Sequence, residues 1–158
     1  MIILGVDPGY DRLGVAVLKK ELGAKEVILF SDCILTDKKN SFESRLLVLG
    51  GALRKVIAKW EPTHLAIEKL FFTKNQKTAM DVAETRGVIL YLAAEHGLSI
   101  HEYTPGQIKA AVTGYGSASK EQVALMVTKL IAIPHKPKYD DEYDALAAAL
   151  TGSATIRL

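Results

Sequence analysis

The chain begins with MIILGVDPG (residues 1–9), an apolar run that ends in an aspartate, a proline and a glycine. A run of Ile, Leu and Val of this length predicts a buried strand. Pro8 and Gly9 predict a turn, because proline cannot donate to a strand ladder and glycine tolerates a tight reversal. An aspartate before Pro-Gly is commonly only a turn residue. A functional interpretation of Asp7 therefore depends on other acids converging on it.

The segments that follow predict an α/β protein. Residues 13–18 return beside the first strand and residues 25–35 form a third, so an antiparallel meander is expected. After it, helices alternate with single strands. The later expected elements are a helix from Ser41 to Trp60, a strand over 64–67, a helix over 78–96, a strand over 98–103, a short helix over 107–112 preceded by Thr104 as N-cap and Pro105 at the first helical position, a helix capped by Ser119 and a last helix over about 140–150. This order describes a mixed five-stranded sheet with helices on both faces.

Length and composition place broad limits on the protein. The 158 residues fit a single domain (1–158) without a linker or repeat. A formal charge of +2 is too small to indicate a polyanionic partner by itself. The single cysteine, Cys33, excludes an intrachain disulfide and fits a reducing compartment. Because neither a signal-peptide pattern nor a membrane-spanning apolar run is found, we expect a cytoplasmic protein without membrane association.

Acidic residues recur where elements end or begin. Glu68 follows the strand over 64–67 just as Asp7 follows the first strand. Asp141 and Asp144 are three residues apart in the first turn of the last helix, so they project from one side of it. Carboxylates are the oxygen ligands that Mg²⁺ and Mn²⁺ prefer, and clustered acids repel one another without such an ion. These acids predict metal-assisted hydrolysis of a phosphodiester.

Acids at the start of a helix also have a simpler interpretation, because they favour the helix dipole and the cap. We interpret Asp140 and Glu142 in this way. Asp144 is different, since it lies beside an alanine-rich stripe that should pack tightly. An unpaired carboxylate there would be costly unless it shared a cation or a proton.

Several short motifs resemble the RuvC family of bacterial Holliday junction resolvases. They cover nearly the whole chain in the family's order and are ILGVDPG (3–9), LAIE (65–68), KN (74–75), TRG (85–87), GSA (116–118) with Lys120, and Asp141 with DALA (144–147). The resemblance implies an RNase H-like fold and a homodimer that nicks four-way DNA junctions symmetrically in recombination and repair. It also implies RuvA and RuvB, the branch-migration proteins, as partners.

The family's four catalytic acids map onto Asp7, Glu68, Asp141 and Asp144. The resemblance implies that they hold two Mg²⁺ ions in each active site, with Mn²⁺ as a substitute. Asp140 stands directly before Asp141, so two registers are possible for the third ligand. The spacing from the motif that begins at Asp144 favours Asp141.

The resemblance also implies DNA-binding residues. Lys109 and Lys120 match positions near the scissile phosphate, and Lys120 is expected to neutralise charge that develops there. By sequence alone both lysines could equally be solvated surface. Phe71 matches an aromatic residue that stacks on bases near the junction centre, in a segment that also contains Lys74.

The helix over 78–96 has a broad apolar surface with the small residues Ala79, Ala83 and Gly87. Small residues allow a second helix to approach closely. We expect this helix to pair with its symmetry mate, because a two-fold enzyme suits a two-fold junction.

Two other classes of protein are compatible with parts of the sequence. A first strand that ends in Asp-Pro-Gly also resembles the phosphate-binding start of actin-like ATPases, but these need a second large lobe. A junction-binding protein without catalysis, or a related YqgF-type nuclease that acts on RNA, is the other alternative. All four acids argue against the inactive version, and Phe71 with Lys109 and Lys120 favours the resolvase.

Overall fold

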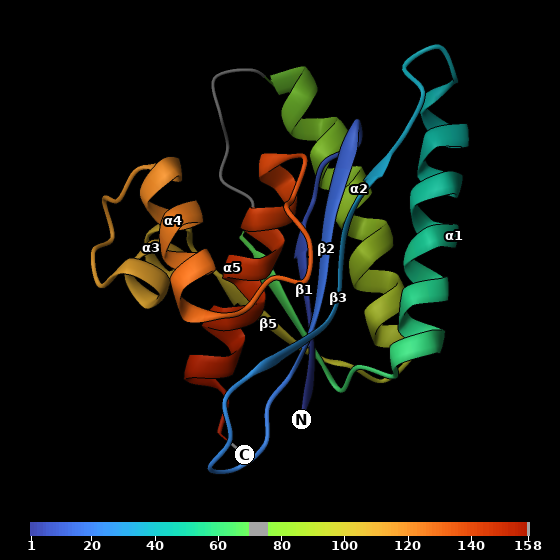
Figure 1. Cartoon of the computed structure of the whole chain (residues 1–158). Coiled ribbons are helices and arrows are strands. Elements are labelled where there is room, and N and C mark those ends of the chain that lie inside the picture. Colours follow the sequence, from blue (N-terminus) through green and yellow to red (C-terminus); the bar gives the residue numbers. More distant parts are fainter. Residues whose placement is uncertain (70–75, 158) are drawn as a thin grey trace.

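A central sheet of five strands runs through the molecule in the order β3-β2-β1-β4-β5 (Figure 1). The structure is a computed structural model that describes residues 1–69 and 76–157. Its strands are β1 (Ile2–Asp7), β2 (Arg12–Lys19), β3 (Val27–Leu35), β4 (His64–Glu68) and β5 (Ser99–Tyr103). The pairs β1–β2 and β2–β3 are antiparallel, whereas β1–β4 and β4–β5 are parallel. The predicted meander and mixed sheet are confirmed.

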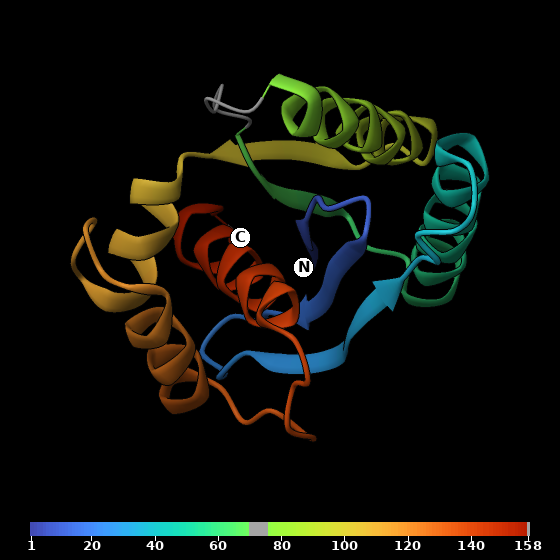
Figure 2. The same cartoon turned by 90° about the horizontal axis from the view of Figure 1, so that it is seen from above.

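Helices cover both faces of the sheet. They are α1 (Phe42–Trp60), α2 (Gln76–Glu95), α3 (Pro105–Thr113), α4 (Lys120–Leu130) and α5 (Asp140–Thr155). Figure 2 shows α5 on one side of the sheet and α1 and α2 on the other, with α3 and α4 beyond α5. Each face has its own apolar core, one beneath α5 and one beneath α1 and α2. None of the helices in the described residues is both long and apolar enough to cross a membrane.

Local sequence signals set most helix starts. The Ser41 side chain accepts a hydrogen bond from the Ser44 amide at the start of α1. Thr104 and Ser119 form capping boxes at the starts of α3 and α4, as the sequence predicts. The structure confirms Thr104 as the N-cap of α3 and Pro105 at its first helical position, so the helix includes the two residues before Gln107.

The last helix is longer than expected and runs to Thr155 rather than ending near Leu150. Its final turns contain hydroxyl residues that ordinarily disfavour a helix interior. Here the Thr151 hydroxyl donates to the carbonyl of Ala147 at 2.8 Å, and the Thr155 hydroxyl donates to the carbonyl of Thr151 at 2.8 Å. The first of these bonds satisfies the hydroxyl of the buried Thr151 inside the helix, and the second satisfies that of the exposed Thr155 at its end.

Two glycines bring α5 unusually close to the sheet. A Cβ atom added at Gly5 would overlap the carbonyl oxygen of Ala145, and one added at Gly14 would overlap the carbonyl oxygen of Asp141. Both obstacles are backbone atoms, which cannot rotate away. The first turn of α5 therefore rests directly on β2 at Gly14, which pairs with Asp7, and the following turns rest on β1 at Gly5.

Candidate active site

Asp7 and Glu68 end two neighbouring parallel strands. Val6 pairs with Ile67, so the next residue of each strand lies at the same edge of the sheet. Side chains alternate between the faces along a strand. Gly5 faces α5, and Asp7, two residues later, faces the same way. The period and register of the strands thus bring both carboxylates beneath the start of α5.

Asp141 and Asp144 come from that start. Asp7 pairs with Gly14 across the β1–β2 ladder, and the backbone of Asp141 rests on Gly14. The first turn of α5 is therefore held directly above the end of β1. Its two acids approach Asp7 from the helix while Glu68 approaches from β4.

The electrostatics show that the four acids form one cluster. Burial, followed in decreasing order by the negative charges of Asp144, Asp141 and Glu68, raises the pKa of Asp7 to about 8, and the charge of Lys120 acts in the opposite direction. The pKa of an isolated aspartate is 3.8. The cluster therefore opposes ionisation of its central member unless a cation compensates the charge.

The pKa values of the neighbouring groups Glu68, Asp144 and Lys120 are also shifted. Burial raises the pKa of Glu68, to which the charge of Asp144 adds, whereas Lys120 and Lys109 lower it. Burial also raises the pKa of Asp144, against the influence of Lys120. The charge of Asp144 in turn raises the pKa of Lys120, whose Nζ lies 3.2 Å from Asp144 Oδ2.

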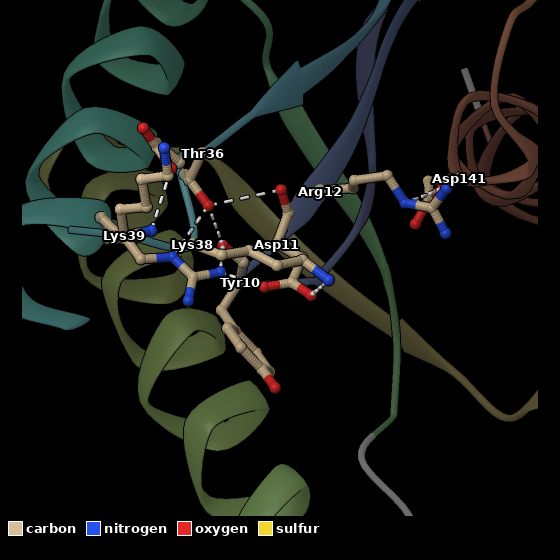
Figure 3. Close-up of polar contacts among 9 residues, drawn as sticks. Tyr10, Asp11, Arg12, Thr36, Lys38, Lys39 and Asp141 are labelled. Carbon is tan, nitrogen blue, oxygen red and sulfur yellow. Dashed lines mark hydrogen bonds and ion pairs between the residues drawn. The ribbon is translucent and has the colours of Figure 1, made fainter. Parts of the chain in front are cut away.

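Two of the acids are paired with cations. Besides the Lys120–Asp144 pair, Arg12 Nε lies 3.1 Å from Asp141 Oδ2 (Figure 3). That oxygen is nevertheless buried without a well-oriented hydrogen bond from any described residue. Its close contact with Arg12 is therefore an ion pair of poor hydrogen-bond geometry.

The donor set fits a hard divalent cation. It consists of carboxylate oxygens that are partly desolvated, mutually repulsive and, at Asp141 Oδ2, short of a hydrogen bond. Within residues 1–69 and 76–157, no three His, Cys, Asp or Glu side chains already adopt a coordinating arrangement. In this arrangement Asp141 pairs with Arg12 and Asp144 pairs with Lys120.

Most of the predicted site residues are brought together. Asp7, Glu68, Asp141, Asp144 and Lys120 share one electrostatic cluster, and Lys109 on α3 is within electrostatic reach of Glu68. Asp140 is exposed, whereas the side chain of Asp141 is only 16% exposed. Phe71 and Lys74 lie outside the described residues.

The interpretation of Glu142 as a residue of the helix cap is wrong. Its side chain is buried and accepts hydrogen bonds from Ser31 Oγ at 2.7 Å and from His135 Nε2 at 2.7 Å. It ties the first turn of α5 to β3 and to the loop before the helix. A charged residue beside an exposed acid gives no sequence signal for such a role, because Ser31 is 111 residues away in the chain and the contact with His135, seven residues away, depends on the path of the loop before α5.

Two arginines to which the sequence analysis gave no role stabilise the segments next to the acids: Arg86 contacts the end of β4, and Arg45 contacts the turn after β1. Arg86 on α2 donates from Nε to the carbonyl of Glu68 at 3.3 Å and forms an ion pair with Glu102. The TRG motif contained Arg86 but gave it no function. The Lys69 amide donates to the carbonyl of Tyr103 at 2.7 Å, which continues the backbone pairing beyond Glu68.

Arg45 fastens the turn that follows Asp7. It is only 8% exposed, and it donates to the carbonyl of Tyr10 at 3.0 Å and to Thr36 Oγ1 at 3.0 Å. Its guanidinium also pairs with Asp11 and lies 4.8 Å from the centre of the Tyr10 ring. A signal was present in the sequence, since Arg45 falls one helical turn before Leu49 on the buried stripe of α1.

A mixed sheet with acids at the ends of its first and fourth strands and at the start of the last helix defines an RNase H-like nuclease. The family model described as crossover junction endodeoxyribonuclease RuvC matches residues 3–152. The chain belongs to this RuvC family.

Individual relatives agree with this assignment. The crossover junction endodeoxyribonuclease RuvC of Ruminiclostridium cellulolyticum is 47% identical over 150 residues, covering 95% of this chain and 90% of the relative. The enzyme of Heliobacterium modesticaldum is 45% identical over 150 residues, covering 95% and 92%. The structure of Thermus thermophilus RuvC in complex with Holliday junction substrate superposes with a TM-score of 0.89 at 31% identity, covering 97% of this chain and 93% of that one.

Proposed function

We propose that the protein is a structure-selective endonuclease that resolves four-way DNA junctions by paired symmetric nicks in recombination and repair. The observation that carries this proposal is the convergence of Asp7, Glu68, Asp141 and Asp144 in one partly buried cluster with Lys120 at its edge. The membership of the chain in the RuvC family supports the junction as the substrate.

We further propose that the four acids hold two Mg²⁺ ions, with Mn²⁺ as a substitute. When bound, such ions supply Lewis acidity toward the phosphate and lower the pKa of water. Asp7 and Glu68, fixed on neighbouring strand ends, would orient the site. Lys120 would neutralise charge that develops on the scissile phosphate during an in-line displacement. Hydrolysis would break the bond to the 3′ oxygen and leave a 5′-phosphate that a ligase can seal.

The remaining DNA contacts are assigned by position. Lys109 lies on α3 beside Glu68, and Lys120 begins α4, so both can approach the strand that enters the cluster. Phe71 stays a predicted stacking residue and Lys74 a predicted phosphate contact. RuvA and RuvB remain the expected partners of the junction complex.

A groove between α1 and α2 supports the proposed homodimer. Its volume is about 650 Å³, and it is lined by Leu46, Leu47, Gly50, Gly87, Val88 and Tyr91 among others. Leu47 is 77% exposed and Tyr91 is 62% exposed, and a Cβ at Gly87 would meet open space. A second copy of the α1–α2 face would bury these apolar side chains, which fits the prediction made for the helix over 78–96.

The test is cleavage of a synthetic four-way junction, compared with a linear duplex of the same sequence, with and without Mg²⁺. We expect two nicks at symmetric positions in opposite strands of the junction and little cutting of the duplex. Asp7→Asn is the control for contaminating nucleases. Equal cutting of both substrates by the wild type, or a requirement for RNA, would overturn the proposal.

A further inference from the structure

A cavity of about 540 Å³ lies beside the acidic cluster. It is lined by the turn after β1 (residues 9–12), the end of β3 with Thr36 and Lys38, Val82 of α2, Tyr139 and Asp141. A second cavity, of about 300 Å³, is lined by Lys120, Asp140 and Asp144 among others. Asp141 thus lines the first cavity and Asp144 the second, so the acids lie between two hollows.

Each hollow has a cation close to an acid. In the smaller hollow this cation is Lys120, already assigned to the scissile phosphate. In the larger one it is Arg12, whose side chain is 48% exposed and points from the turn toward Asp141 (Figure 3). The Arg12 guanidinium also lies 5.4 Å from the centre of the ring of Tyr139, the N-cap residue of α5. This cation–π contact helps to fix the position of the guanidinium.

Lys38 supplies a second cation to the larger cavity. Its side chain is 77% exposed, and its Nζ lies 3.0 Å from Asp11 Oδ2. Asp11 does not depend on Lys38, because the buried Arg45 pairs with the other oxygen of the same carboxylate. The positive charge of Lys38 is therefore available to a ligand.

The ion pair that Lys38 makes with Asp11 is a weak competitor, because Lys38 is largely exposed, whereas Arg12 pairs with an Asp141 oxygen that is buried but receives no well-oriented hydrogen bond. Pairs between exposed side chains contribute only about 0–1 kcal/mol, because water and salt screen them. A DNA phosphate offers a full negative charge, and a guanidinium can bind two of its oxygens at once. The cavity is lined by two cations, Arg12 and Lys38, and two carboxylates, Asp11 and Asp141; because the buried Arg45 behind it already pairs with Asp11, the charge of Lys38 is left for a polyanion.

We propose that Arg12 and Lys38 form a second backbone-binding subsite, which holds phosphates of the cleaved strand on the Asp141 side of the cut. This inference rests on the proposed nuclease function and adds to it the path of the strand, from the Lys120 hollow across the acids to Arg12 and Lys38. Both residues act as positioning residues, because they contact the DNA beside the scissile bond and not at it.

The first test measures the salt dependence of binding. A fluorescently labelled four-way junction is titrated with Arg12→Gln, Lys38→Gln and the double variant in EDTA, so that no cutting occurs. Each lost phosphate contact should lower the slope of log K against log salt by about 0.9. Lys39→Gln is the matched control, because Lys39 is an exposed neighbour that does not line the cavity. It should leave the slope unchanged.

The second test locates the contact. Junctions are made with one neutral methylphosphonate at each linkage near the cut. At one linkage we expect the wild type to lose affinity while Arg12→Gln loses nothing further, and a neighbouring linkage should couple to Lys38 in the same way. Such non-additivity identifies a direct pair. Thermal melts of the variants verify that they fold.

The outcomes separate the two proposals. Slopes equal to that of Lys39→Gln for both variants, together with additive effects at every linkage, would overturn the subsite even if cleavage fell. Failure of the wild type to prefer a junction over a duplex would instead overturn the proposed function. Lys38 is remote from the metal ligands in sequence, so its variant tests the subsite independently of any disturbance to Asp141.

Discussion

At the level of single residues, Asp7 lies at the centre of the acidic cluster, where ionisation of its carboxyl group is unfavourable. Its pKa is raised from 3.8 to about 8, so at pH values between these two the folded protein keeps a proton that the unfolded chain has released. Stability therefore falls as the pH rises through this window, by up to about 1.4 kcal/mol for each pKa unit. A bound cation would remove this cost.

Asp7→Asn should consequently stabilise the metal-free protein at pH 8 and have little effect near pH 4. The amide has the same shape as the acid and carries no charge at either pH, whereas Asp7 is forced to ionise as the pH approaches 8. We expect the melting temperature in EDTA to rise by at least about 5 °C at pH 8. Circular dichroism at both pH values tests this. Equal shifts at the two values would show that the charge of Asp7 is not the cause.

The same substitution should abolish cleavage. Asp7→Asn, Glu68→Gln and Asp144→Asn should each reduce the rate by at least about 100-fold, the scale seen when a group that stabilises the transition state is removed. Binding to the junction should remain nearly intact. Asp140→Asn should stay active, because Asp140 is exposed. An inactive Asp140→Asn together with an active Asp141→Asn would show that the ligand register is wrong.

At the level of elements, the close packing of α5 on Gly5 and Gly14 of the sheet sets the geometry of the site. Gly14→Ala would place a Cβ against the carbonyl oxygen of Asp141, and this backbone atom can move only with the helix. We expect a loss of about 1–3 kcal/mol in stability, typical of overpacking, and a larger loss of cleavage because Asp141 shifts.

A matched variant controls for the added methyl group. At Gly106, in the first turn of α3, the nearest atom to an added Cβ is 3.9 Å away. Gly106→Ala should therefore be neutral or slightly stabilising. Urea unfolding of both variants, followed by cleavage assays, completes the comparison. A Gly14→Ala protein as stable and active as the wild type would contradict the close seat of α5.

At the level of the whole molecule, the uncovered α1–α2 face predicts the oligomeric state. Tyr91→Glu should convert the dimer into a monomer, because it replaces an exposed aromatic ring with a further negative charge in a groove that already contains Glu43 and Glu84. Leu22→Glu is the control, since Leu22 is 89% exposed and lies in the β2–β3 connection. Sedimentation at micromolar concentration gives the mass. A monomeric wild type that still makes paired nicks would refute the dimer.

The sequence predicted the parts of the fold and site that depend on local order. Asp7 and Glu68 were found because each follows an apolar strand, and parallel pairing then brings them together. The caps at Ser41 and Thr104 were likewise visible within three or four residues. The helix over 78–96 was predicted from its periodicity, with an error of two residues at its start.

The supporting contacts could not be predicted, because they join distant segments. Arg12 meets Asp141, and Ser31 meets Glu142, across more than a hundred residues of chain. Nothing in the surroundings of either partner distinguishes such a residue from solvated surface. Only the tertiary fold, with α5 seated on glycines, makes these pairs.

The position of α5 has a consequence for protein synthesis. Domains begin to fold from the N-terminus while the ribosome is still extending them. Asp7 and Glu68 emerge early, but Asp141 and Asp144 appear only when α5 is translated. Until then the apolar surface of β1 and β2 that α5 covers stays bare, and the acids lack half of their cluster. An unfinished chain should therefore lack the complete acidic cluster on which the proposed cleavage depends.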